Sequence, residues 1–160
     1  LLTGLTKIIK EKKIKCPIAI KISPDIKDVE ISKIVDLVCS HNIKGIIVSN
    51  TKDSNRDNLT DIKKYETGGL SGQPLKNIST NLIKKFYKET KGKIKIIGVG
   101  GVDSGQSAYE KITAGADVVQ LYTGMVYKGP GIVKEIKKEL ISILKKENFK
   151  NISEAVGINA

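Results

Sequence analysis

A lysine stands within a short β-branched run, at a position where a lysine is costly. Lys21 shares one face of the expected strand 17–23 with Ala19 and Ser23, while isoleucines occupy the other face. Parallel strands are normally covered on both faces, and a buried ammonium needs an anionic partner or it loses its proton. We therefore interpret Lys21 as a cation beside a ligand that carries or develops negative charge. A surface lysine on an edge strand is the alternative interpretation.

Small polar residues stand at the end of a second apolar run. Ser49, Asn50 and Thr51 occur where the run 45–49 ends. Their hydroxyl and carboxamide groups can hydrogen-bond a polar ligand, but Asn and Thr are equally common in the ordinary turns that end strands. The residues alone leave both interpretations open.

Glycines at the ends of two further runs favour a phosphate site. Residues 98–101 read Gly-Val-Gly-Gly, and a helix is expected to begin near Ser104. Glycine lets the backbone approach a phosphate, and free N–H groups at a helix N-terminus favour an anion. Asp103 stands where a Rossmann fingerprint requires glycine, so this is a different motif. Together with residues 122–124, Tyr-Thr-Gly at the end of the last run, the glycines predict a phosphate site.

The surrounding pattern places these residues at one edge of a parallel sheet. Four β-branched runs predict strands at 17–23, 45–49, 94–99 and 117–122. Apolar residues at helical spacing predict helices at 1–13, 28–41, 79–90, 104–114 and 130–147, with a short helical turn after 151. Strands that alternate with helices in this way are parallel and are joined by helical crossovers.

All of the unusual chemistry stands at the strand ends, which form the active face of α/β sheets and (β/α)8 barrels. A long loop runs from Asn50 to about Lys76, and loops of this length are usually functional. Four strands are half of a (β/α)8 TIM barrel, and 160 residues fall short of its usual ~250. We therefore expect residues 1–160 to be the C-terminal half of a single α/β barrel domain. The chain has no initiator methionine, so we expect a longer protein.

The composition argues against several other classes of protein. The formal net charge is +11, but the cations are spread over several helices and Arg56 is the only arginine. With seven aromatic residues, this pattern is typical of solvated surfaces rather than of nucleic-acid binding. No apolar run is long enough to span a membrane. Cys16, Cys39 and His41 fit no metal-binding or hydrolytic arrangement, so we expect reduced thiols and no metal.

Several motifs occur together in the order and spacing of one enzyme family. The chain resembles dihydroorotate dehydrogenase, and this resemblance covers essentially its whole length. The string Gly-Gly-Leu-Ser-Gly-Gln-Pro-Leu and the closing segment favour the class 2, quinone-linked branch over the class 1 enzymes. The matching segments are 18–25, 47–51, 68–75, 97–103, 114–116, 120–124 and 150–157.

The resemblance implies a barrel that binds flavin mononucleotide (FMN) and oxidises dihydroorotate to orotate in pyrimidine synthesis, with quinone as the electron acceptor. It implies that Lys21 lies at the edge of the flavin and stabilises the negative charge of its reduced form. Family members often have serine at the position of Thr123, and the hydroxyl group is kept here. The resemblance further implies FMN contacts from Ser49, Gly72, Gly101, Tyr122 and Thr123, and substrate hydrogen bonds from Asn50 and Thr51.

The catalytic base of the family, a serine in class 2, is expected upstream of residue 1, so we assign no catalytic residue to this chain. The segment that meets quinone and the membrane surface is expected upstream too. The resemblance implies a peripheral protein of the inner membrane, either the bacterial cell membrane or the mitochondrial inner membrane. We expect the 160-residue chain by itself to be inactive.

Two alternatives stay open at this stage. A class 1 dihydroorotate dehydrogenase, or a related FMN barrel such as a dihydropyrimidine dehydrogenase domain, would use fumarate or NAD in place of quinone. A basic half-barrel that binds phosphate-rich partners such as RNA would instead show binding that weakens steeply with salt and does not involve FMN.

Overall fold

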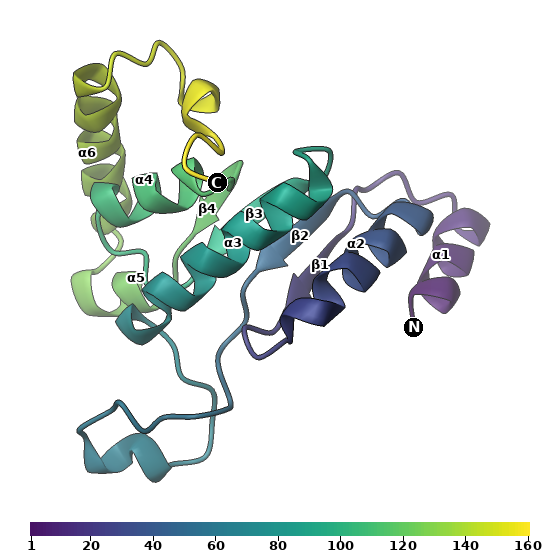
Figure 1. Cartoon of the computed structure of the whole chain (residues 1–160), viewed down its shortest axis with the longest axis horizontal. Coiled ribbons are helices and arrows are strands. Elements are labelled where there is room, and N and C mark those ends of the chain that lie inside the picture. Colours follow the sequence, from purple (N-terminus) through teal and green to yellow (C-terminus); the bar gives the residue numbers. More distant parts are fainter.

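Strands and helices alternate along the chain in the computed structural model, which describes residues 1–160 (Figure 1). The strands are β1 (Ala19–Ile22), β2 (Gly45–Val48), β3 (Lys95–Val99) and β4 (Val118–Gln120). The α-helices are α1 (Leu2–Glu11), α2 (Ile31–Ser40), α3 (Lys76–Thr90), α4 (Gly105–Thr113), α5 (Thr123–Lys128) and α6 (Ile132–Lys146). Short 3-10 helices cover Asp28–Glu30, Ile62–Tyr65, Gln73–Leu75 and Ile152–Ala155. None of the helices has the length and apolar composition that a membrane crossing requires.

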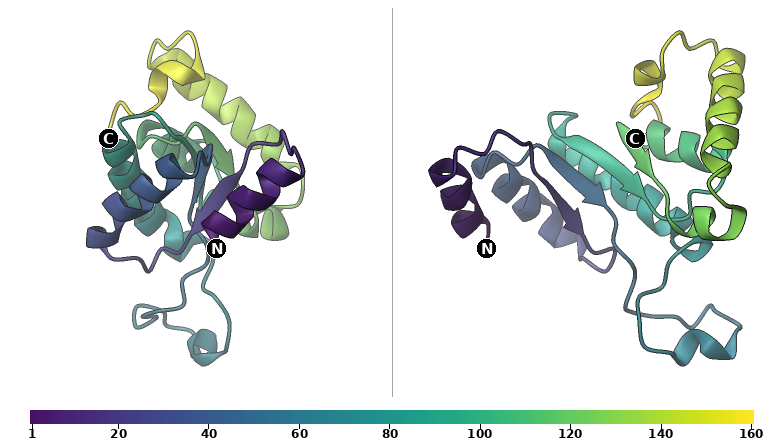
Figure 2. Two further views of the ribbon diagram at one scale, coloured as in Figure 1. Left: turned by 90° about the vertical axis from the view of Figure 1, so that its right-hand side faces the viewer. Right: turned by 180° about the vertical axis from the view of Figure 1, so that it is seen from behind.

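The sheet is entirely parallel, and its strands stand in the order in which they occur in the sequence, β1-β2-β3-β4. Doubly wound sheets reverse this order at one point and carry helices on both faces. Here α2 and α3 lie against one face, and the view from behind shows the strands in front of these helices (Figure 2). Consecutive βα units of a (β/α)8 barrel have this arrangement, as the sequence predicted.

The hydrophobic core lies between the sheet and the helices on its covered face. Ile46, Val48 and Ile96 point toward this face from β2 and β3 and are completely buried. Val38 of α2 and Phe86 of α3 pack over them and are also completely buried. Because successive side chains of a strand point to opposite faces, every second side chain of these strands packs against the helices.

The opposite face of the sheet carries Lys21, Ile47, Ile97 and Val118 in neighbouring positions. Lys21 and Val118 are exposed, while Ile47 and Ile97 are half-buried. In a closed barrel this face points to the interior, which side chains fill in layers. A ligand at the carboxyl ends of the strands would meet the last residues of this face.

The predicted strands and helices are all present, with shifted ends. The helix predicted at 79–90 begins earlier, at Lys76, directly after the turn that contains Pro74. The predicted helix 28–41 is divided into a 3-10 turn and α2. The sequence did not predict α5, because six residues that include a glycine are too few to show a helical period.

The long loop after β2 is confirmed, and it extends away from the sheet and helices (Figure 1). A short antiparallel pairing closes its neck, with the Lys52 N–H donating to the Leu70 carbonyl at 3.0 Å and the Leu70 N–H returning a bond of 2.8 Å. Inside the loop, Arg56 donates to the carbonyl oxygens of Glu66, at 2.7 Å, and Gly68. The only arginine of the chain therefore holds this loop together.

Candidate active site

A cavity of about 720 Å³ opens where the four strands end. This volume falls in the usual range for small-molecule sites, about 300–1,000 Å³. Lys21 of β1 and residues that end or follow β2, β3 and β4 contribute to its wall, and the long loop and the start of α5 complete it. The cavity is lined by every residue that the sequence predicted as a ligand contact, namely Lys21, Ser49, Asn50, Thr51, Gly72, Gly101, Tyr122 and Thr123.

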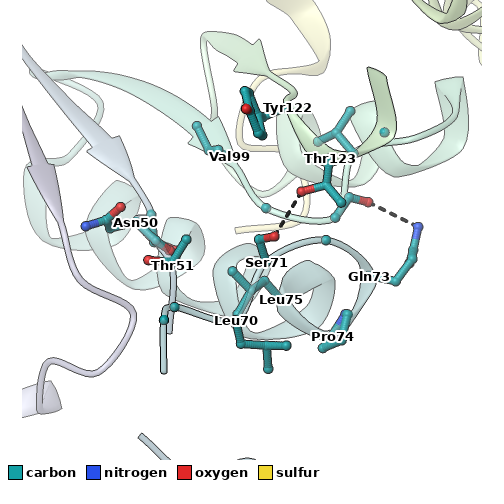
Figure 3. Close-up of a pocket in the computed structure, with 18 of the residues that line it drawn as sticks. Asn50, Thr51, Leu70, Ser71, Gln73, Pro74, Leu75, Val99, Tyr122 and Thr123 are labelled. Atoms are coloured by element: carbon teal, nitrogen blue, oxygen red, sulfur yellow. Dashed lines mark hydrogen bonds between the residues drawn. The ribbon is translucent and has the colours of Figure 1, made fainter. Parts of the chain in front are cut away.

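The long loop meets α5 and the turn after β3 at one side of the cavity (Figure 3). Thr123 Oγ1 donates a hydrogen bond to Ser71 Oγ at 3.1 Å, and Gln73 Nε2 donates to the carbonyl oxygen of Gly101 at 3.4 Å. Gly72 lies between these contacts with a φ of +79°, and a Cβ there would lie 3.0 Å from Thr123 Cγ2. The approach of the loop to α5 therefore depends on glycine at position 72.

The turn after β3 consists of Gly100 and Gly101, which both have positive φ, +113° and +69°. A Cβ on Gly101 would lie 2.6 Å from the Cβ and 2.9 Å from the backbone nitrogen of Lys76. The turn thus lies directly against the start of α3 and has no room for a side chain. Bare backbone at a cavity wall can approach a phosphate closely, as the sequence predicted for this segment.

The N-terminus of α4 is not available to this cavity in the way that the sequence suggested. The N–H of Gly105, the first residue of the helix, donates to a carboxylate oxygen of Glu139 in α6. Ser104 caps the helix by accepting from the Ser107 N–H at 3.1 Å, and Ser107 Oγ accepts from the Asp103 N–H at 3.0 Å. The chain itself satisfies these donors and places a carboxylate at the positive end of the helix. The expected phosphate site is therefore confined to the glycine turn and the end of β4.

The residues that follow β2 form the opposite side of the cavity from Tyr122 and Thr123 (Figure 3). Ser49 is 2% exposed, and its hydroxyl donates to the Asn50 carbonyl at 3.2 Å. Asn50 is exposed at the cavity, and Thr51 is half-buried beside the long loop. A carboxamide and a hydroxyl at this position can pair with the amide edge of a planar polar ligand.

Lys21 reaches the cavity from the end of β1. Its side chain is exposed, because residues 1–160 do not themselves cover this face of the strand. The helices pack on the opposite face of the sheet, where α2 and α3 form the main core and α4 and α6 form a second cluster beside β4, and the uncovered face is the one that points to the interior of a closed barrel. Lys21 belongs to this uncovered face, beside Ile47, where its ammonium can meet a ligand in the cavity.

Asp25 attaches the base of the long loop to the segment that follows β1. Its carboxylate accepts hydrogen bonds from the N–H groups of Asp53, at 2.9 Å, and Ser54, at 3.3 Å, and from Ser54 Oγ. Lys52 Nζ lies 3.8 Å from the same carboxylate. Burial alone would raise the pKa of Asp25, but these hydrogen bonds and the charge of Lys52 hold it below the usual 3.8. The ionised carboxylate therefore anchors one wall of the cavity.

The charges around the cavity favour an anionic ligand. Five cationic and three anionic side chains line it, which gives the wall a positive balance. Positive charge lining a cleft raises the local concentration of anions. The charged lining residues are Lys21, Arg56, Lys63, Lys64, Lys128, Asp61, Glu66 and Asp103.

The family model for dihydroorotate dehydrogenase matches residues 1–144. The chain belongs to the dihydroorotate dehydrogenase family. It is 45% identical over 156 residues to the dihydroorotate dehydrogenase (quinone) of Trichodesmium erythraeum, a match that covers 93% of this chain and 41% of that protein. It is 41% identical over 160 residues to the mitochondrial dihydroorotate dehydrogenase (quinone) of Mus musculus, covering 97% of this chain and 40% of that protein.

A solved dihydroorotate dehydrogenase, that of Eimeria tenella in complex with ferulenol, superposes with a TM-score of 0.85 and 40% identity. This match covers 89% of the present chain and 38% of that one. The chain thus spans about 40% of the length of the dihydroorotate dehydrogenases that it matches. Both the predicted half of a (β/α)8 barrel and the predicted resemblance to the quinone-linked branch are confirmed.

Sequence reasoning missed some residues in or behind the walls of this cavity. Ser71 and Gln73, which tie the long loop to the other walls, flank Gly72 within the string 68–75, so the string itself was the available signal. Lys111 is fully buried behind the glycine turn. Its spacing from Ala108 and Ile112, which place one face of α4 in the core, was a signal that the sequence offered and that was not used.

Proposed function

We propose that this chain is the C-terminal half of the barrel of a quinone-linked dihydroorotate dehydrogenase, an enzyme that oxidises dihydroorotate to orotate with FMN as its cofactor. The observation that carries the proposal is the convergence of all eight predicted contact residues on one cavity at the carboxyl ends of the strands. Membership of the family and the names of the quinone-linked relatives support it.

The residues of the cavity fit FMN, which when bound accepts a hydride from dihydroorotate and passes the electrons to quinone. Gly72 and Gly101 let a ligand approach the backbone closely. Neither position has room for a side chain, because a Cβ there would lie 3.0 Å or less from a neighbouring atom. The hydroxyl of Thr123 and the ring of Tyr122 flank this backbone. We assign the FMN phosphate to this side and add Ser49 as a further FMN contact.

Three side chains of this chain act on the reaction through charge and hydrogen bonding. The Lys21 ammonium supplies positive charge where negative charge develops during hydride transfer, and a fixed opposite charge at that point lowers the barrier. The carboxamide of Asn50 and the hydroxyl of Thr51 orient the pyrimidine ring of the substrate. We assign the removal of the substrate proton to a base outside residues 1–160, as expected from the family resemblance.

Quinone and the membrane surface are proposed to meet parts of the enzyme outside this chain. The relatives include mitochondrial enzymes named for quinone, which supports a peripheral place on an inner membrane. No nucleic-acid partner is proposed, because the lysines are spread over several helices and a single arginine is used inside a loop.

The test uses protein expressed from its complete coding sequence. We expect a flavin absorbance band that bleaches on anaerobic addition of dihydroorotate and returns on addition of a quinone. Lys21→Met should slow bleaching by about 10²-fold or more, in the range reported for removal of a charge-stabilising group. Lys137→Met, which removes a charge from α6, should leave the rate unchanged. A colourless protein that takes up no FMN would refute the proposal.

The acceptor separates this proposal from the class 1 alternative. Rapid return of the flavin band with fumarate or NAD, and none with quinone, would assign the chain to class 1 or to a related FMN barrel. Salt-sensitive RNA binding by a protein without flavin would favour the phosphate-binding half-barrel.

A further inference from the structure

Lys111 of α4 is fully buried, and only neutral oxygens accept hydrogen bonds from it. Its Nζ donates to Ser79 Oγ at 2.6 Å, to Thr80 Oγ1 at 3.1 Å and to the Lys76 carbonyl at 3.3 Å, all in α3. Gly98 of β3 makes room for its stem, since a Cβ there would lie 3.3 Å from Lys111 Cδ. Burial of an ammonium without an anionic partner is costly, so its presence requires a specific reason.

The ammonium determines the direction of the Ser79 hydroxyl. A charged lysine has three donors and no acceptor, so Ser79 Oγ must accept from Lys111 and give its own proton elsewhere. The carbonyl oxygens of Lys76 and Gly100 both lie 3.3 Å from Ser79 Oγ. The Lys76 carbonyl already accepts from Thr80 Oγ1 at 2.7 Å and from Lys111. Gly100 is therefore the better acceptor for Ser79.

Gly100 belongs to the turn that forms the wall of the cavity on the side assigned to phosphate. The turn is held from its other end by Gln73, which donates to the Gly101 carbonyl at 3.4 Å. A chain of hydrogen bonds therefore runs from buried Lys111 through Ser79 to a cavity wall that Lys111 itself does not line.

We propose that Lys111 is a positioning residue for the phosphate of FMN. Its buried ammonium directs the Ser79 hydroxyl onto the Gly100 carbonyl, and this holds the Gly100–Gly101 turn in the shape that receives the phosphate. The identity of the anion rests on the function proposed above, whereas the hydrogen-bond relay rests on the geometry of α3, α4 and the turn.

The relay depends on the protonation of Lys111. Burial lowers the pKa of Lys111 to about 8, while Glu110 on its own helix raises it and Lys76 on α3 lowers it further. The side chains of Glu110 and Lys76 pair with each other at 2.9 Å, and on β3 the residue beside the Lys111 stem is Gly98, which carries no charge. A neutral amine has a lone pair that can accept the Ser79 proton, which releases the Gly100 carbonyl. Phosphate binding should therefore weaken as the pH rises through about 8.

The test measures FMN affinity by flavin fluorescence quenching from pH 6.5 to 9.5, on apoprotein made from the complete coding sequence. We expect Lys111→Met and Ser79→Ala each to weaken binding about tenfold at pH 7, and the double variant to be no weaker than Lys111→Met. The affinity of the unchanged protein should fall by a similar factor across this range, while that of Lys111→Met stays flat. Lys88→Met, which removes an exposed charge from α3, is the matched control.

A second readout does not need the cofactor. Amide hydrogen exchange of residues 99–102 in apoprotein should become faster in Lys111→Met and Ser79→Ala and stay unchanged in Lys88→Met. Unchanged FMN affinity and unchanged exchange in both variants would overturn the inference, even where the unchanged protein binds FMN. If no protein binds FMN, the proposed function fails, and the exchange data alone then support or overturn the relay.

Discussion

At the scale of single residues, Lys111 links the stability of the fold to pH. Burial lowers the pKa of Lys111 from 10.5 to about 8, a difference equivalent to about 3 kcal/mol. Below pH 8 the folded state holds a desolvated charge at full cost. Between about pH 8 and 10.5 the unfolded chain binds this proton more tightly than the folded chain does, so the free energy of unfolding rises with pH.

Lys111→Met should therefore raise the free energy of unfolding at pH 7 by about 1–3 kcal/mol and remove the rise between pH 8 and 10.5. Without Lys111, the Lys76 carbonyl is free to accept from Ser79 and still accepts from Thr80, so the substitution leaves no hydroxyl donor without a partner. Urea unfolding at pH 7, 8.5 and 10 measures both effects. An identical pH slope in the variant and the unchanged protein would contradict this prediction.

Gly101 offers a second prediction at this scale. Gly101→Ala should lower the free energy of unfolding by about 2–4 kcal/mol, because a Cβ would enter Lys76 and the φ of +69° strains any other residue. Gly92→Ala is the matched control, since Gly92 has the same φ of +69° and a Cβ there would lie 3.6 Å from its nearest neighbour, the hydroxyl oxygen of Tyr87. Backbone strain alone should lower the free energy of unfolding of Gly92→Ala by about 1 kcal/mol. Equal losses in the two variants, measured by urea unfolding, would show that the contact with Lys76 is unimportant.

The eight predicted contact residues could be named from the sequence because seven of them stand at or near a strand end, while Gly72 belongs to the string 68–75 that carries the family resemblance. Lys111 and Ser79 could not be paired in the same way, since their contact joins two helices and no local pattern specifies which side chains meet there. The exposure of Lys21 follows from the half-barrel, because its face of the sheet is the one that points to the interior of a closed barrel.

At the scale of elements, the attachment of the long loop depends on Asp25. The pKa of Asp25 is below its usual 3.8, so the attachment is present above this pH and is lost as the pH falls through the lower folded value. Asp25→Ala should therefore free the base of the loop at pH 7. We expect limited proteolysis within residues 54–68 to become several-fold faster. Asp57→Ala, at an exposed carboxylate in the same loop, should keep the original rate; faster cleavage in both variants would refute a specific role for Asp25.

Strands and long helices could be predicted from the periodic spacing of their apolar residues, whereas short helices and turns could not. The strands have clear β-branched runs, and α6 carries apolar residues at helical spacing over its length. By contrast, α5 and the 3-10 turns at Ile62–Tyr65 and Gln73–Leu75 have too few residues for any period to appear.

At the scale of the whole molecule, β1 and β4 are the two edges of an open sheet. Unpaired edges and an uncovered face with Val118 55% exposed favour association with other copies. The 160-residue chain expressed alone should therefore sediment as oligomers. Val118→Lys should shift it toward monomer, while Val133→Lys on α6 should not. A stable monomer of the unsubstituted chain at micromolar concentration would contradict this prediction.

The cavity takes its walls from residues as far apart in the chain as Lys21 and Lys128. A ribosome adds about 5–20 residues per second, so roughly 5–20 s pass between the synthesis of these two residues. During that interval β1 and β2 can already pair, but the glycine turn and α5 do not yet exist. A ligand that needs all of these walls can consequently be captured only after residue 128 has been synthesised, and a nascent chain that stops earlier cannot hold it.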